Sequence, residues 1–101
     1  MAGFRRERIA EMIHRELAVR LPGALKDPAL PPVSITHIEI SRDLKRAEIH
    51  YMPLGGGDSS AALAEALDAA GRALRGPVGR SLRLRHAPRL SFRVDEHTEA
   101  A

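Results

Sequence analysis

The sequence predicts a small α+β domain in which a three-stranded sheet packs against helices, in the order helix, strand, strand, helix, helix, strand. Apolar residues recur every three or four positions in two long segments, as in amphipathic helices, and alternate with polar residues in short segments, as in strands. The chain of 101 residues is long enough for one compact core and too short for two ordinary domains. We therefore expect a single domain.

The first helix is predicted over residues 4–21, which place apolar side chains at spacings of three and four on one face. Pro22-Gly23 is expected to end this helix. The connection from there to Pro32 contains four prolines and a glycine, so we expect an extended segment with little helix. The apolar face of the helix comprises Ile9, Met12, Ile13, Leu17 and Leu21.

Two strands are predicted over residues 33–41 and 46–53, joined by a short polar hairpin at residues 42–45. The apolar residues of the first strand change parity part-way, and a bulge near Thr36-His37 restores a single buried face. The second strand alternates without interruption. Its buried face is expected to carry Ala47, Ile49 and Tyr51.

The second half of the chain predicts a flexible loop at residues 54–57 and then a helix capped by Asp58 or Ser59. The apolar stripe of this helix continues through Gly71 without losing phase, so we predict two helices joined by a tight kink at Ala69-Ala70-Gly71. A second break is expected at Pro77, where the helix restarts. The stripe comprises Leu63, Leu67, Ala70, Leu74, Val78 and Leu82. A third strand follows Pro88, with Leu90, Phe92 and Val94 alternating against polar residues.

Arginine is concentrated in about a quarter of the chain. Residues 69–94 contain seven arginines and no acidic residue, although the whole chain has 16 basic and 13 acidic residues and a net charge of only +3. Such segregation is typical of a protein that binds a polyanion. The last seven residues carry three carboxylates, which predicts a short acidic tail from about residue 95.

Composition disfavours several kinds of site. The chain has no cysteine, so it has no disulfide, thiolate metal site or cysteine nucleophile. Its five histidines are scattered and no carboxylate completes a ligand set, so we expect no metal site and no cofactor. Ser41-Arg42-Asp43 lies in a predicted turn, where serine and aspartate form turn hydrogen bonds, and we expect no enzyme activity.

Two further absences bear on partners and location. One tyrosine, two phenylalanines and no tryptophan disfavour a fold that binds single strands mainly by aromatic stacking. No apolar run approaches the roughly 20 residues that cross a bilayer, and no secretory signal is visible. We therefore expect a cytoplasmic protein.

Three stretches carry a resemblance to a known family, together with the amphipathic first helix: KDPAL (26–30), VSITHIEISRDLKRAEIHY (33–51) and AAGRALRGPVGRSLRLRHAPRLSF (69–92). The order of elements resembles the type II KH architecture, which clamps nucleic-acid backbone at a glycine loop. More specifically, the chain resembles the ribosome-binding factor A family. The resemblance implies an RNA-binding protein that attaches to the small (30S) ribosomal subunit and its 16S ribosomal RNA, assists late maturation of that RNA, and leaves before translation begins. It also implies that an Ala-x-Gly kink, here Ala69-Ala70-Gly71, replaces the usual Gly-x-x-Gly loop.

The kink frees backbone N–H groups at the start of the following helix, where the helix dipole favours a phosphate. Gly71 there permits close approach of an RNA backbone, although a glycine also suits helix packing. A literal Gly-x-x-Gly at residues 76–79 leaves under two turns for a following helix, so the main bend is placed at Gly71. The predicted phosphate contacts are Arg72, Arg75, Arg80, Arg83 and Arg85, with Lys45 and Arg46 at the hairpin and Arg5, Arg6 and Arg8 at the N-terminus as secondary candidates that otherwise are solvated charges. Arg89 and Arg93 share one face of the third strand and are left outside the predicted site.

Two other functions are compatible with these residues. The same fold serves a KH-type protein that binds another RNA. The basic helix also suits a protein–protein interaction module with an acidic partner. In each case we expect binding without covalent chemistry, and for the ribosomal function a monomer away from the ribosome.

Overall fold

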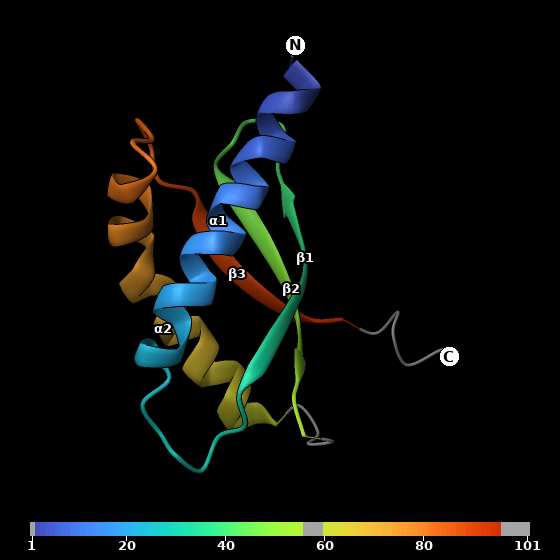
Figure 1. Cartoon of the computed structure of the whole chain (residues 1–101), viewed down its shortest axis with the longest axis vertical. Helices are drawn as coiled ribbons and strands as arrows, with labels where there is room; N and C mark the ends of the chain where they lie inside the picture. Colours follow the sequence, from blue (N-terminus) through green and yellow to red (C-terminus); the bar gives the residue numbers. More distant parts are fainter. Residues whose placement is uncertain (1, 56–59, 96–101) are drawn as a thin grey trace.

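The computed structural model describes residues 2–55 and 60–95 and shows two helices on one face of a three-stranded sheet (Figure 1). The strand order is β1-β2-β3, with β1 and β2 antiparallel and β2 and β3 parallel. The predicted α+β class is therefore confirmed, but one long helix stands where two were expected. The elements are α1 (Ala2–Ala24), β1 (Val33–Ile40), β2 (Arg46–Pro53), α2 (Ala61–Ser81) and β3 (Arg89–Val94).

The core lies between the helices and the sheet, and it is built from the apolar positions that the periodicity identified. Ile13 and Leu17 of α1 are fully buried, as is Ile49 of the central strand. The rings of Tyr51 and Phe92 meet edge to face with centroids 6.4 Å apart. The stripe of α2 is buried from Leu63 through Val78. Burial of this continuous apolar surface is the main force that holds the helices on the sheet.

The predicted bulge in β1 is present. The register with β2 shifts between Ile35 and His37, so Thr36 is the extra residue and Ile38 and Ile40 point into the core. The inserted residue explains why apolar residues of both parities are tolerated in one strand.

The hairpin between β1 and β2 is held by its own polar side chains, as expected for a turn. The Asp43 carboxylate accepts hydrogen bonds from the Ser41 hydroxyl at 2.7 Å and from the Lys45 amide at 3.0 Å. These two bonds, the Ser41 bond first, lower the pKa of Asp43. Ser41 therefore stabilises the turn, which is the role that the sequence predicts for it.

The ends of both helices differ from the predictions. Pro22 does not end α1: a proline removes its own N–H bond and crowds the preceding turn, but the helix continues to Ala24 and the Leu25 amide donates to the Leu21 carbonyl at 3.1 Å. The N-cap of α2 is Ser60, whose hydroxyl oxygen accepts from the Leu63 amide at 3.1 Å. Asp58 and Ser59, the predicted caps, and Gly56-Gly57 of the predicted loop lie outside the described residues.

α2 is one continuous helix from Ala61 to Ser81, so the predicted separation into two helices at Gly71 and the restart at Pro77 are wrong. The axis nevertheless changes direction between its yellow first half and its orange second half (Figure 1). A proline in the interior removes one hydrogen bond and crowds the preceding turn, which bends a helix without ending it. Because the apolar stripe stays in phase across the bend, both halves remain packed on the same sheet.

After α2 the chain turns through a left-handed residue, Arg83, with φ of 55°. The Arg83 amide donates to the Arg80 carbonyl at 3.1 Å, and the Leu84 amide donates to the Gly79 carbonyl at 3.0 Å. This is a Schellman ending, in which glycine usually occupies the left-handed position. β3 then begins beside the hairpin, where the Arg89 amide donates to the Lys45 carbonyl at 2.8 Å.

The acidic tail and the membrane spans are the last two features to compare with the sequence predictions. Asp95, where the acidic tail was placed, is buried, and its amide donates to the Tyr51 carbonyl at 2.8 Å. The rest of the predicted tail, residues 96–101, lies outside the described residues. Across the described segments, neither helix has the length and apolar character needed to cross a bilayer.

Candidate nucleic-acid interface

A groove runs between α2 and β3, the edge strand of the sheet. Its cavity volume is about 360 Å³, and three arginines surround it: Arg72 and Arg75 from the helix and Arg89 from the strand. The remaining lining residues are Asp68, Gly71, Leu90 and Ser91. We call this feature the α2/β3 groove.

Gly71 sets how closely the helix approaches the strand in this groove. A Cβ atom at this position would lie 2.9 Å from the Leu90 carbonyl oxygen and 3.3 Å from Cε1 of Phe92. Gly71 is buried, and its φ is not in the left-handed region. Of the two interpretations in the sequence, the geometry therefore favours helix packing: the bare side of Gly71 faces β3 instead of an incoming RNA backbone.

The three arginines of the groove are held to different degrees. Arg75 is anchored, because its Nε donates to the Ala87 carbonyl at 3.0 Å. Arg72 and Arg89 are exposed and form no ion pair within the described chain. Their guanidinium groups thus keep all their donors available for an anion, in the planar arrangement that suits bidentate phosphate contacts.

The backbone of the predicted hairpin residues Lys45 and Arg46 lies beside the start of β3. Arg46 and Arg89 are partners in the parallel register, and the Lys45 carbonyl bonds the Arg89 amide. Directly paired residues of neighbouring strands share one face, so Arg46 and Arg89 form a cationic pair at the start of β3. The structure therefore brings Arg72, Arg75 and Arg89 together in the groove, and it pairs Arg46 with Arg89 across β2 and β3.

The other predicted arginines do not join this group. The Arg80 guanidinium lies over Gly76, 3.2 Å from the place where a Cβ atom of that residue would stand. Arg83 forms the turn after α2, and Arg85 is exposed in the connection to β3. The predicted single cluster of five arginines is thus divided between the groove, the far part of α2 and the connection that follows it.

The excess positive charge is nevertheless uncompensated. Of the seven arginines in residues 69–94, all of them within the described chain, only Arg93 has an ion pair: it contacts Glu48 at 3.4 Å on the open face of the sheet. Asp68 lines the groove without pairing with either helix arginine. The groove thus has three arginines against one aspartate, and a concave surface with such an excess of positive charge attracts a polyanion.

Arg89 is the residue that sequence reasoning missed. The alternation of β3 correctly placed it on the exposed side of the strand, but alternation says nothing about what lies beside an edge strand. Its proximity to Arg72 depends on the close contact of α2 with β3. The signal in the sequence was Gly71 itself, which marks a close approach of two elements.

Comparison with known proteins identifies the family. The family model described as ribosome-binding factor A matches residues 5–101. This protein belongs to the ribosome-binding factor A family. The factor of Thioalkalivibrio sulfidiphilus is 39% identical over 95 residues, which cover 94% of this chain and 74% of that protein. The factor of Thermomicrobium roseum is 35% identical over 101 residues, covering 100% of this chain and 78% of that protein.

Solved structures confirm that the fold is that of the ribosome-binding factor A family and hence the expected KH-like one. The solution structure of a Thermotoga maritima protein assigned to ribosome binding factor A superposes with a TM-score of 0.77 at 28% identity, covering 98% of this chain and 94% of the other. The crystal structure of the Thermus thermophilus factor superposes with a TM-score of 0.65 at 21% identity, covering 93% and 96%. This second likeness concerns the fold alone.

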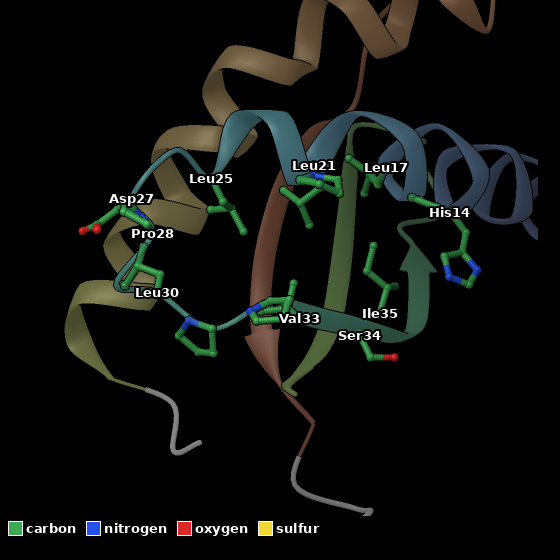
Figure 2. Close-up of a pocket in the computed structure, with 14 residues that line it drawn as sticks. His14, Leu17, Leu21, Leu25, Asp27, Pro28, Leu30, Val33, Ser34 and Ile35 are labelled. Atoms are coloured by element: carbon green, nitrogen blue, oxygen red, sulfur yellow. The ribbon is translucent and has the colours of Figure 1, made fainter. Parts of the chain in front are cut away.

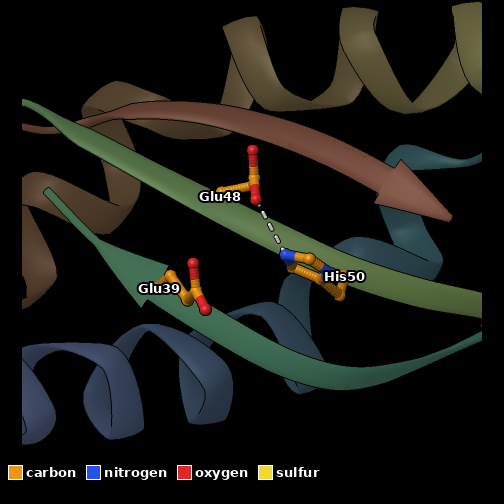
Figure 3. Close-up of side chains that lie close together, drawn as sticks. All are labelled: Glu39, Glu48 and His50. Carbon is orange, nitrogen blue, oxygen red and sulfur yellow. Dashed lines mark hydrogen bonds and ion pairs between the residues drawn. The ribbon is translucent and has the colours of Figure 1, made fainter. Parts of the chain in front are cut away.

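The open face of the sheet carries a group that the sequence did not reveal. Glu39 and Glu48 are register partners on β1 and β2, and the nearest ligand atoms of these two and of His50 lie within 4.8 Å of one another (Figure 3). Nε2 of His50 is 2.8 Å from the Glu48 carboxylate. The expectation that no carboxylate completes a ligand set around a histidine overlooked this group, because strand pairing joins residues that are distant in sequence. His50 and Arg93 both contact the Glu48 carboxylate, whereas the Glu39 carboxylate contacts His37 at 3.3 Å, and the prediction of no metal site stays a prediction.

A second concave feature lies where α1, the proline-rich connection and β1 meet (Figure 2). This pocket has a volume of about 480 Å³, and Leu17, Leu21 and Leu25 face Val33 and Ile35 across it. No lysine or arginine lines it. It therefore lacks the charge that a phosphate site needs, and it is separate from the α2/β3 groove.

Proposed function

We propose that this protein binds the small (30S) ribosomal subunit through its 16S ribosomal RNA and assists late maturation of that RNA in the cytoplasm, as a monomeric single domain. It acts by holding RNA segments in place without covalent chemistry. The observation that carries the proposal is the α2/β3 groove, in which Arg72 and Arg89 present unpaired guanidinium groups in a member of the ribosome-binding factor A family.

Support comes from the family and from the kind of contact that the groove allows. The Thermus thermophilus factor has been fitted into a cryo-EM map of a 30S complex; its fitted coordinates superpose on this chain with a TM-score of 0.60 at 24% identity and cover 81% of it. The groove offers charge and shape but no array of base-reading side chains, so phosphate recognition dominates. Arg80, Arg83 and Arg85 add cations outside the groove.

The test is sedimentation with purified small subunits over a series of salt concentrations. Replacing Arg72 and Arg89 together by alanine removes two unpaired cations without touching the core, so the thermal melt stays unchanged while association weakens. The slope of log affinity against log salt becomes shallower by about 1.4 if each arginine contacts one phosphate of a single strand. The matched control replaces Arg15 and Lys26, two exposed cations outside the groove, by alanine and is expected to bind as the wild type does.

The outcomes separate this proposal from the two other functions. If the groove variant binds subunits as well as the control variant does, the groove is not the contact. Equal affinity of the wild type for unrelated RNAs favours a general KH-type binder. Binding to subunits that is insensitive to salt favours a protein–protein interaction instead.

A further inference from the structure

Phe4 differs from the other aromatic residues in its surroundings. Tyr51 is only 2% exposed, and its ring contacts Phe92 at the core. Phe4, on the first turns of α1, is 60% exposed. Exposing a phenylalanine ring to water is unfavourable, so a ring that is presented in this way beside a hollow suggests a surface that becomes covered.

A hollow of about 480 Å³ lies beside this ring. Five of its lining residues come from α1 and one comes from the connection after α2. On α1, Phe4, Arg8 and Met12 are spaced by four and follow one stripe, with Arg5 and Ile9 on the next. The lining residues are Phe4, Arg5, Arg8, Ile9, Met12 and Leu84.

The hollow is built on the core and is not the result of a loose helix end. Ile9 at its floor is 5% exposed and belongs to the core cluster. Leu84 on the opposite wall packs partly against the same cluster, and its amide is fixed to the Gly79 carbonyl at 3.0 Å. The left-handed turn at Arg83 is what directs Leu84 back toward α1.

The lining combines an apolar floor, one aromatic face and two cations, and none of its residues within the described part of the chain carries a carboxylate. A flat uncharged ring attached to an anionic chain complements such a surface, because the ring stacks on the phenylalanine while the arginines meet the anions. An unpaired nucleobase in an RNA strand has this chemistry. Arg83 and Arg85, both exposed, flank Leu84 along the chain and supply cations next to the second wall.

We propose that this hollow holds one unpaired base of the bound RNA, stacked on Phe4, with Arg5 and Arg8 contacting the adjoining phosphates. The inference rests on the proposed function and adds to it a second contact, distinct from the α2/β3 groove. Arg83 and Arg85, which lie outside that groove, are the chain neighbours of Leu84 in the wall of the hollow.

The chain contains no tryptophan, so a Phe4→Trp variant places the protein's single tryptophan at the site, where it can be excited apart from Tyr51. Adding purified small subunits is expected to quench its emission through stacking with the base. The matched control is Val19→Trp, at a position that is 80% exposed on the same helix and outside the hollow, and its emission is expected to stay unchanged. Equal responses of the two variants would overturn the proposal.

Affinity gives an independent measurement. A stacked base contributes about 1–3 kcal/mol, so Phe4→Ala is expected to weaken association with subunits by about 5- to 150-fold, whereas Phe4→Tyr retains wild-type binding. Because the ring is largely exposed, the melt of Phe4→Ala is expected to match that of the wild type. If the wild type binds subunits and Phe4→Ala binds them equally well, the base site is refuted but the proposed function is not. If the wild type does not bind subunits, the proposed function is refuted.

Ultraviolet crosslinking gives a third measurement. The Phe4→Trp complex is expected to crosslink the protein to RNA, and a crosslink to a ribosomal protein instead would also refute the base site.

Discussion

Replacing Gly71 by alanine tests whether this glycine is needed for packing against β3. In the interior of a helix the exchange is intrinsically favourable by about 1 kcal/mol. Here, however, the new methyl group would lie 2.9 Å from the Leu90 carbonyl oxygen and 3.3 Å from the Phe92 ring. The nearer atom belongs to the backbone of β3, which pairs with β2 and cannot turn aside as a side chain does. The helix must therefore move outward by about half an ångström, and a gap of that size already forfeits about a quarter of the dispersion energy across a contact.

Forcing a methyl group into a well-packed contact costs about 1–3 kcal/mol, which exceeds the gain in helix propensity. We therefore expect Gly71→Ala to lower the free energy of unfolding by about 1 kcal/mol and the melting temperature by about 4–8 °C. Gly23→Ala is the control at a second helical glycine, in α1, since its methyl group would meet nothing of the described chain within 4 Å beyond its own stretch of helix. That variant is expected to gain about 0.5–1 kcal/mol. Urea unfolding followed by circular dichroism measures both changes, and a Gly71→Ala protein as stable as Gly23→Ala would refute the packing argument.

Three further outcomes follow from the local geometry. Arg83→Gly is expected to stabilise the protein by about 0.5–1 kcal/mol in urea unfolding, because φ of 55° strains any residue with a Cβ atom; a loss of stability would contradict this. Ser60→Ala is expected to destabilise it by about 1 kcal/mol through the lost bond to the Leu63 amide, and Ser60→Asp retains the cap; equal thermal melts of these two variants would argue against the cap. The native pKa of Asp43 is lowered, so its contribution to stability is present above the ordinary carboxyl pKa and is lost as the pH falls through the native one. Asp43→Asn is therefore expected to be less stable than the wild type near pH 7 and equally stable at pH values below that native pKa, measured by thermal melts across the acid range; a difference that persists in acid would show another cause.

Local patterns in the sequence predicted most of the fold because each depends on the nearest neighbours in the chain. The bulge at Thr36 followed from the change of parity in β1, and the buried face of β2 followed from strict alternation. The same reasoning misplaced the end of α1 at Pro22 and divided α2. In both places a helix-breaking signal was real but was outweighed by packing, since the apolar stripe on either side stays on one core.

The candidate site was harder to predict because it depends on which segments lie side by side. The density of arginine in residues 69–94 pointed to an anion-binding surface, but helix continuity carried Arg80 and Arg83 away from the groove. Parallel pairing of β2 with β3 placed Arg89 next to Arg46, and no local pattern encodes that register. The proximity of Glu39 to Glu48 and His50 was missed for the same reason.

The glycines of α2 link the packing of the fold to the geometry of the candidate site. A Cβ atom on Gly79 would lie 2.6 Å from Cβ of Ala87, and one on Gly71 would lie 2.9 Å from the Leu90 carbonyl oxygen, so both bare positions face the segment that enters β3. The Gly-x-x-Gly at residues 76–79 is thus no loop, because Gly79 is a buried contact within the helix. With the segment from Ala87 to Leu90 held along the helix, the backbone of Arg89 lies beside α2, and Arg75 strengthens the contact through its bond to the Ala87 carbonyl. Gly71 and Gly79 therefore contribute to the groove indirectly. They allow α2 to pack closely on the segment that enters β3, and this packing sets the distance between the arginines of the two elements.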